Sequence, residues 1–79
     1  MITFDEAKTK AKSLNSDVNA CNEYDKGYLF FNKNANSDGN NGVVIVKENG
    51  DAITFINFIM RYHPSKTFKP LPMGTKVRG

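Results

Sequence analysis

The run that decides the fold is residues 43–55, Val43-Val44-Ile45-Val46-Lys47-Glu48-Asn49-Gly50-Asp51-Ala52-Ile53-Thr54-Phe55. An Asn-Gly pair here separates two runs of β-prone residues. This is the strongest short-range signal of a β-hairpin that a sequence offers. The sequence therefore predicts two strands that fold back on each other through a turn at residues 49–50, and an antiparallel sheet as the framework.

Upstream, residues 3–14 have the pattern of an amphipathic helix. Thr3 and Glu6 are spaced as a capping box, in which each side chain accepts a hydrogen bond from the backbone of the other. Apolar residues follow on one face, at Phe4, Ala7, Ala11 and Leu14. Two of these are alanines, so we expect the helix to lie close against the sheet.

Between this helix and the Asn-Gly turn, the clearest element is the aromatic run 27–32. Strand alternation would turn Tyr28 and Phe30 to one side and Leu29 and Phe31 to the other, which suits a central strand. Residues 15–21 leave open whether another helical turn follows the first helix. Residues 22–26 are polar and lead into the strand, and the Asn-rich run 32–41 is expected to form an exposed loop.

The segment after the Asn-Gly turn fits two structures. The hairpin requires a strand from Ala52 to about Phe55, and the β-prone residues beyond it favour a continued strand. The spacing of Phe55, Phe58, Ile59 and Tyr62 also fits one face of a helix, so a switch to helix remains the alternative. Residues 63–64 end the element, and residues 67–69 can add a short edge strand.

Together these elements predict an α+β fold, with an N-terminal helix packed on an antiparallel sheet of three to four strands and a central Asn-Gly hairpin. The chain has 79 residues, enough for a single domain with a small core. We assign that domain to residues 1–73 and expect a flexible basic tail at residues 74–79.

The only cysteine, Cys21, excludes a disulfide within the chain, and no signal-like or membrane-spanning apolar run is present. We therefore expect a soluble protein of the cytoplasm, in a bacterial host or a phage-infected cell, with no membrane partner. The net charge is +3, and the excess lies at the end of the chain. Residues 61–79 carry five Lys and Arg and no acid, whereas residues 1–60 carry eight acids and six lysines.

Candidate catalytic and metal sites find little support. Residues 34–39 resemble the first half of a calcium loop, but Ile45 stands where a bidentate Glu is needed. One histidine, His63, and one cysteine cannot build a Cys/His zinc site, and nothing brings a nucleophile, a base and an acid together. We predict no enzymatic activity, no catalytic residues, no metal and no cofactor.

The excess of large apolar residues favours protein binding. Phe30, Phe31, Ile56, Phe58, Ile59 and Met60 are many for one alanine-faced helix to cover, so an apolar sheet face or edge is left for a partner. We predict a contact surface at Phe58, Met60, Tyr62 and Arg61. The partner is a protein of unknown identity, or a second copy in a homodimer or higher homo-oligomer.

The alternative is a small nucleic-acid-binding protein. Its contacts would come from the basic C-terminal segment, namely Arg61, Lys66, Lys69, Lys76 and Arg78. Tyr62 and Phe68 interleave with these cations, as stacking aromatics do in proteins that bind single strands.

The order of an opening helix at residues 2–7, the aromatic strand Gly27-Tyr28-Leu29-Phe30-Phe31 and the run 43–52 resembles small α-β-β-β proteins of bacteria and their phages. These include immunity proteins of toxin systems, the Imm35-like group. The resemblance covers about residues 2–60. It implies a non-enzymatic accessory factor, such as an inhibitor or immunity protein, that acts by binding another protein.

Overall fold

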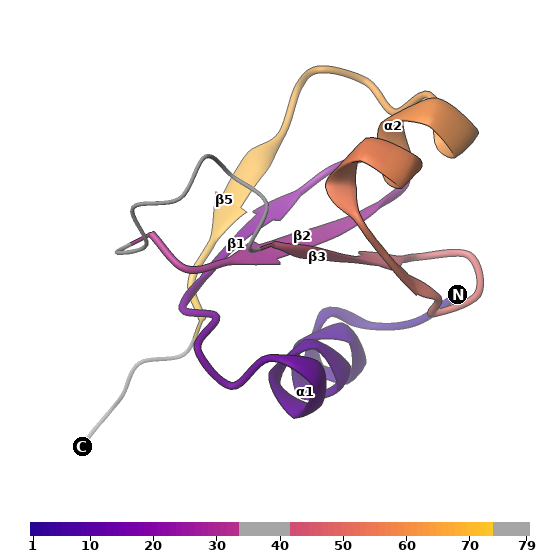
Figure 1. Ribbon diagram of the computed structural model, residues 1–79. Coiled ribbons are helices and arrows are strands. Elements are labelled where there is room, and N and C mark those ends of the chain that lie inside the picture. Colours follow the sequence, from indigo (N-terminus) through magenta and orange to yellow (C-terminus); the bar gives the residue numbers. More distant parts are fainter. Residues whose placement is uncertain (34–41, 74–79) are drawn as a thin grey trace.

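The computed structural model describes residues 1–33 and 42–73, which form a five-stranded antiparallel sheet with one helix on each face (Figure 1). The fold is α+β, as predicted, but the sheet has five strands rather than three to four. In chain order the elements are α1 (Phe4–Leu14), β1 (Ala20–Glu23), β2 (Gly27–Phe31), β3 (Val43–Val46), β4 (Ala52–Ile53), α2 (Phe55–Tyr62) and β5 (Lys69–Leu71). The strand order across the sheet is β4-β3-β2-β1-β5.

Helix α1 begins at the predicted capping box. Thr3 Oγ1 accepts a hydrogen bond from the Glu6 N–H at 3.2 Å, and Glu6 Oε1 accepts one from the Thr3 N–H at 2.9 Å. Ala7 and Ala11 are fully buried against the sheet, because their small side chains allow the helix to approach it closely. Leu14, at the end of the same predicted face, is exposed.

The central strand β2 contributes to both layers of the core. Tyr28 and Phe30 lie on the α1 side and pack in a cluster with Ala7, Ala11, Val18, Cys21 and Ile45. Leu29 lies on the other side and packs against a second cluster of Tyr24, Val44, Val46 and Phe58, the last of these from α2. The apolar character of both faces of residues 27–31 is thereby explained.

The strands that flank residues 49–50 are antiparallel neighbours, with Val44 opposite Ile53 and Ile45 opposite Ala52. The connection is longer than two residues. The Val46 N–H donates to the Asp51 carbonyl at 2.8 Å, the Gly50 N–H donates to the Val46 carbonyl at 2.7 Å, and Gly50 takes a positive φ of 76°. Strand β4 lies at the edge of the sheet, so this pair of strands is not at its centre.

The preference for a continued strand beyond Phe55 is wrong, and the helical alternative is correct. Strand β4 ends at Ile53, and Thr54 caps α2 by accepting a hydrogen bond from the Asn57 N–H to its Oγ1 at 3.1 Å. Helix α2 ends at His63, which adopts the left-handed conformation (φ 49°) before Pro64. The β-prone residues of this segment therefore form a helix because the helical spacing gives Phe58 a place in the core.

The remaining predictions concern β1, the edge strand β5 and residues outside the described ranges. Residues 20–23 form β1, which pairs with both β2 and β5. The helical turn that residues 15–21 leave open therefore does not include Ala20 and Cys21, and the polar lead expected at residues 22–26 begins within a strand. The edge strand expected at residues 67–69 begins at Lys69. Most of the loop 32–41, the calcium-like run 34–39 and the tail 74–79 lie outside the described residues. In the part that is described, neither helix has the length and apolar character needed to cross a membrane.

Candidate protein-binding surface

Helix α2 holds to the sheet through one aromatic face. Phe58 is fully buried, and its ring lies 5.9 Å from that of Tyr24 and 6.0 Å from that of Tyr62. The ring of Phe55 lies 5.8 Å from Tyr24 on the same side. This corrects the expectation that Phe58 contacts a partner, because none of its surface is accessible.

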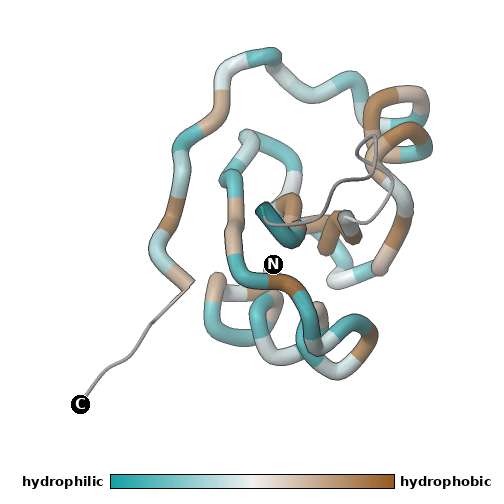
Figure 2. The backbone as a smooth tube through the Cα atoms, turned by 60° about the vertical axis from the view of Figure 1, so that its left-hand side comes forward, coloured by the Kyte–Doolittle hydropathy of each residue, from teal (hydrophilic) through white to brown (hydrophobic). Residues whose placement is uncertain are grey.

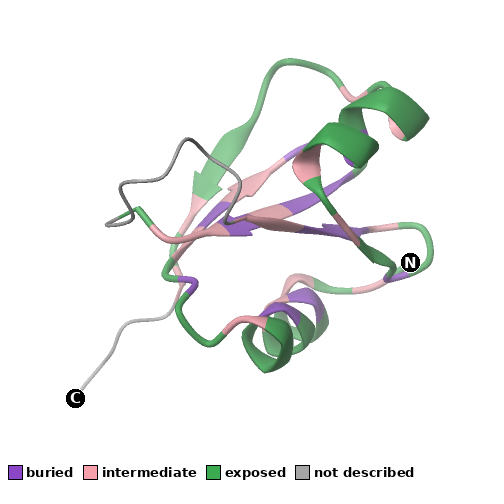
Figure 3. Cartoon of the chain, viewed as in Figure 1, coloured by how far each residue is buried: buried purple, intermediate pink, exposed green. Residues whose placement is uncertain are grey.

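The opposite side of α2 is also apolar and faces solvent. Ile56, Ile59 and Met60 are 60%, 44% and 67% exposed. At about 100° of rotation per residue, these three side chains span an arc of roughly 100° on the helix. We call them the outer face of α2. Figure 2 shows hydrophobic colouring over most of the helix, and Figure 3 shows that its outward side is exposed.

The four residues predicted for the contact surface therefore separate. Met60 belongs to the outer face. Arg61 is also exposed, but at about 100° of rotation per residue it lies on the other flank of α2, with Asn57 between it and Met60. Tyr62 is partly buried against Phe58, and Phe58 is in the core. The predicted contact surface did not include Ile56 and Ile59, although the sequence counts both among its excess of large apolar residues. Reading residues 55–62 with the helical period would have placed both next to Met60.

The sheet itself offers less to a partner than the sequence suggested. Helix α2 packs on the face opposite α1, so that face is partly covered (Figure 1). Both edges are short: β4 has two residues, and β5 has three, including Pro70, which cannot donate a ladder hydrogen bond. Strand addition at either edge therefore has few backbone groups to use.

The connector from α2 to β5, residues 63–68, is attached to the turn between β1 and β2. The Ser65 N–H donates a hydrogen bond to Asp25 Oδ1 at 3.1 Å. The ring of Phe68 lies 5.5 Å from that of Tyr24, which also contacts Phe55 and Phe58 of α2. Helix and connector thus share Tyr24 as a common anchor, and Phe68 remains 47% exposed beside it.

The cations of the predicted nucleic-acid site do not share one face. Lys69 stands opposite Glu23 in the sheet register, and Glu23 stands opposite Tyr28, so the Lys69 side chain is on the α1 side. Arg61 belongs to α2, on the other side. Lys76 and Arg78 lie outside the described residues. The three described cations are all exposed, but they do not form a single strip for a phosphate backbone.

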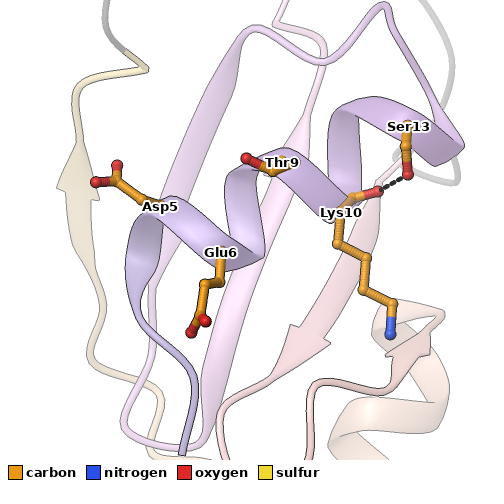
Figure 4. A pocket seen from close by; sticks show the side chains of 5 residues that line it. All are labelled: Asp5, Glu6, Thr9, Lys10 and Ser13. Carbon is orange, nitrogen blue, oxygen red and sulfur yellow. Dashed lines mark hydrogen bonds between the residues drawn. The ribbon is translucent and has the colours of Figure 1, made fainter.

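Among residues 1–33 and 42–73, two surface hollows are lined by polar side chains. One lies along α1 and is lined by Asp5, Glu6, Thr9, Lys10 and Ser13 (Figure 4). All five belong to a single helix, and the Ser13 hydroxyl is already bonded to the Lys10 carbonyl at 2.7 Å. The Lys10 ammonium donates to the Gly50 carbonyl at 2.5 Å, which ties α1 to the turn after β3. The polar side chains of Lys10 and Ser13 in this hollow are therefore explained by their contacts within the fold.

The second hollow lies between the β1–β2 turn and the connector. It is lined by Glu23, Tyr24, Asp25, Lys47, Ser65, Thr67, Phe68 and Lys69. Its main charges neutralise each other, because Lys47 Nζ contacts Glu23 Oε2 at 2.8 Å and also lies 5.1 Å from the centre of the Tyr28 ring. Its hydroxyl and carboxylate groups bind backbone: Ser65 Oγ accepts a hydrogen bond from the Thr67 N–H at 3.2 Å, and Asp25 Oδ1 accepts one from the Ser65 N–H at 3.1 Å.

Burial raises the pKa of three titratable groups among the described residues. Burial raises the pKa of the Cys21 thiol to about 12, and the charge of Glu23 adds to that effect. The thiol is therefore neutral near pH 7 and a poor nucleophile. Burial also raises the pKa of Tyr24 and of Tyr28. Across residues 1–33 and 42–73, no group of three His, Cys, Asp or Glu side chains is placed to hold a metal ion.

Comparison with known proteins finds no matching family model, no similar curated protein and no similar solved structure.

Proposed function

We propose that this protein is a non-enzymatic protein-binding domain that docks a partner protein on the outer face of α2. The observation that carries the proposal is the double-sided apolar character of this helix. Phe55, Phe58 and Tyr62 already pack this helix against the core cluster on the sheet. The apolar side chains on its outer face belong to neither of the two core clusters of the described residues and are exposed.

The exposed apolar side chains on the outer face of α2 favour binding to another protein. A surface helix needs only one apolar stripe to pack on its domain, whereas α2 carries a second apolar side that is exposed. The outer face exposes an apolar area of about 300 Å², comparable with the largest patch on ordinary monomers, and such patches are often functional. Methionine adds adaptability, because its flexible thioether fits irregular partner surfaces.

An accessory factor of inhibitor or immunity type, encoded by a bacterium or phage, fits this proposal. Such a protein acts by covering part of its target. It needs a rigid platform and one well-formed contact surface. Here the platform is the sheet, and α2 is fixed to it by the buried ring of Phe58.

The test is a capture experiment followed by a binary binding measurement. The protein is immobilised, and a partner that binds to it is identified and purified. The purified partner is then titrated against the wild type by calorimetry. Replacing Ile56 and Met60 by Ser should weaken its binding at least tenfold, because central apolar anchors dominate such interfaces. The heat capacity change of binding should be negative, since apolar surface is removed from water.

The matched control is Leu14→Ser, which makes the same kind of change at an exposed position of α1, on the other side of the sheet. Its binding should equal that of the wild type, and both variants should keep the wild-type melting temperature. A partner that binds the α2 variant and the wild type equally would overturn the proposal. Failure to capture any protein that distinguishes the two would count against it equally.

A further inference from the structure

The turn between β3 and β4 contains a chemically labile pair of residues. In an Asn-Gly sequence the backbone nitrogen of glycine can attack the side-chain amide carbon of asparagine, because glycine has no Cβ to obstruct the approach. The sequence has two such pairs, at residues 41–42 and 49–50. Both residues of the second pair are described, and Asn49 is exposed to solvent. Asn49 is therefore a candidate site of deamidation.

Deamidation at Asn49 would consume only water. The Gly50 nitrogen forms a bond to Asn49 Cγ, the bond from Cγ to Nδ2 breaks, and the proton of the Gly50 N–H leaves with the ammonia. Water then opens the cyclic imide at one of its two carbonyl carbons. The product is aspartate or isoaspartate, and in isoaspartate the backbone runs through Cγ and is longer by a carbon atom.

The folded turn holds both reacting groups in place. The Gly50 N–H donates a hydrogen bond to the Val46 carbonyl at 2.7 Å, and Gly50 is buried. Asn49 Oδ1 accepts a hydrogen bond from the Asp51 N–H at 2.9 Å, which fixes the orientation of the side-chain amide. Since the Gly50 nitrogen must give up its proton to react, its bond to Val46 has to break first. The reaction therefore requires local opening of the turn.

The N-terminal segment closes this turn from outside. The Lys10 ammonium donates to the Gly50 carbonyl at 2.5 Å, and the Ile2 N–H donates to the Lys47 carbonyl at 3.0 Å. The Ile2 side chain also covers Gly50, where an added Cβ would lie 3.3 Å from Ile2 Cγ2. Residues from the start of the chain and from α1 thus contact both sides of the labile pair.

We propose that Asn49 is a deamidation site that the folded protein keeps closed, and that the hydrogen bond from Lys10 to the Gly50 carbonyl limits how often the turn opens. The modification would act on the segment that follows. Strand β4 has only two residues, and its pairing with β3 depends on the length of the turn. An isoaspartate at position 49 would lengthen the turn and displace β4, which leads directly into α2 through Thr54.

The first test compares the folded and unfolded chain. Each is incubated at mildly alkaline pH, and deamidation is followed by peptide mapping with mass spectrometry. Trypsin cleavage after Lys47 places Asn49 and the Asn-Gly pair at residues 41–42 in different peptides. Deamidation of Asn49 should be at least about tenfold slower in the native protein than in urea, because only the opened turn reacts. Equal rates would overturn the proposal.

A pair of variants tests the role of Lys10. Lys10→Met removes the ammonium but keeps an unbranched side chain, and it should raise the native rate about threefold, as expected for loss of a solvent-exposed hydrogen bond from a charged group. Lys12→Met makes the same change of charge at an exposed position of the same helix and should leave the rate unchanged. In urea all three chains should react equally. An unchanged native rate in Lys10→Met would overturn the role of this contact.

Dependence on urea separates opening of the turn from unfolding of the domain. Local opening exposes little surface, so the rate in Lys10→Met should hardly change in urea below the unfolding transition. A rate that rises steadily from the lowest urea concentrations would show that Asn49 reacts through global unfolding. That result would overturn the proposed control by Lys10.

The effect on β4 is tested with the modified protein itself. The isoaspartate form is purified by chromatography and compared with Asn49→Asp, which carries the same charge on an ordinary backbone. The isoaspartate form should unfold at a lower urea concentration than Asn49→Asp, because only its turn is longer. Equal midpoints would show that β4 tolerates the longer turn and would overturn the proposed displacement.

Discussion

The hydroxyl of Thr54 accepts a hydrogen bond from the backbone N–H of Asn57 at 3.1 Å, and this contact marks the point where the chain changes from strand to helix. Thr54 itself is extended, with φ −74° and ψ 160°, so it continues the direction of β4. Its side chain then satisfies a donor that the first turn of α2 leaves without a partner. One β-prone residue thus serves as the last extended position and the first cap.

Replacing Thr54 by Ala should lower the free energy of unfolding by about 1 kcal/mol, because the Asn57 N–H loses its acceptor. Urea unfolding followed by circular dichroism measures the change. Thr54→Ser is the matched control, since it keeps the hydroxyl and should stay within about 0.5 kcal/mol of the wild type. Equal stability of Thr54→Ala and the wild type would show that the cap contributes nothing to α2.

Residues 52–62 show how far the sequence alone could be interpreted. Composition favours a strand there, and the spacing of Phe55, Phe58 and Tyr62 favours a helix. The prediction from the spacing is the correct one, because packing on the sheet overrides the intrinsic β preference of these residues. Thr54 followed three residues later by Asn57 is not a capping box, so local sequence gave only part of the helix start signal.

Other elements depend on contacts between distant parts of the chain. Residues 20–23, Ala-Cys-Asn-Glu, have little strand character, yet they form β1 because β2 and β5 pair with them on both sides. No local pattern in residues 20–23 predicts their pairing with β2 and β5. The outer face of α2 can likewise be predicted only if residues 55–62 are taken as a helix. Ile56 and Ile59 share one side of a helix but lie on opposite faces of a strand.

The two sides of α2 should respond very differently to truncation. Phe58→Ala removes a fully buried ring and should cost about 3–5 kcal/mol, enough to unfold a domain of this size. Met60→Ala truncates an exposed side chain and should stay within about 0.5 kcal/mol of the wild type. Chemical denaturation measures both, and Phe58→Leu provides a milder core variant that remains folded. A large loss of stability in Met60→Ala would show that the outer face belongs to the core.

Burial of Cys21 should make stability depend on alkaline pH. The unfolded thiol releases its proton near its ordinary pKa of 9.0, whereas the folded thiol holds it to about 12. Between these values the unfolded state binds fewer protons, so the free energy of unfolding falls as pH rises through this window and is unaffected below it. Tyr24 and Tyr28, whose pKa values burial also raises, act in the same direction above pH 10.

The Cys21→Ala variant separates the thiol from the tyrosines. Its urea midpoint should decline less steeply than that of the wild type between about pH 8 and pH 10.5, because only the tyrosine contribution remains. In the wild type, a thiol reagent at neutral pH should react slowly with the native protein and rapidly once urea unfolds it. Parallel pH profiles for the two proteins would contradict the assignment of the effect to Cys21.

The position of α2 over the sheet depends on the absence of a side chain at Gly27. A Cβ at this position would lie 3.0 Å from the Ile45 carbonyl oxygen, 3.2 Å from Phe58 Cε1 and 3.2 Å from Val44 Cγ1. Gly27→Ala should therefore lower the free energy of unfolding by about 1–3 kcal/mol, as overpacking in a core does. A double-mutant cycle with Phe58→Leu measures how much of this cost comes from the ring. The coupling should exceed about 0.5 kcal/mol, because the two positions are in direct contact. Strictly additive effects would show that the helix does not rest on the strand at this point.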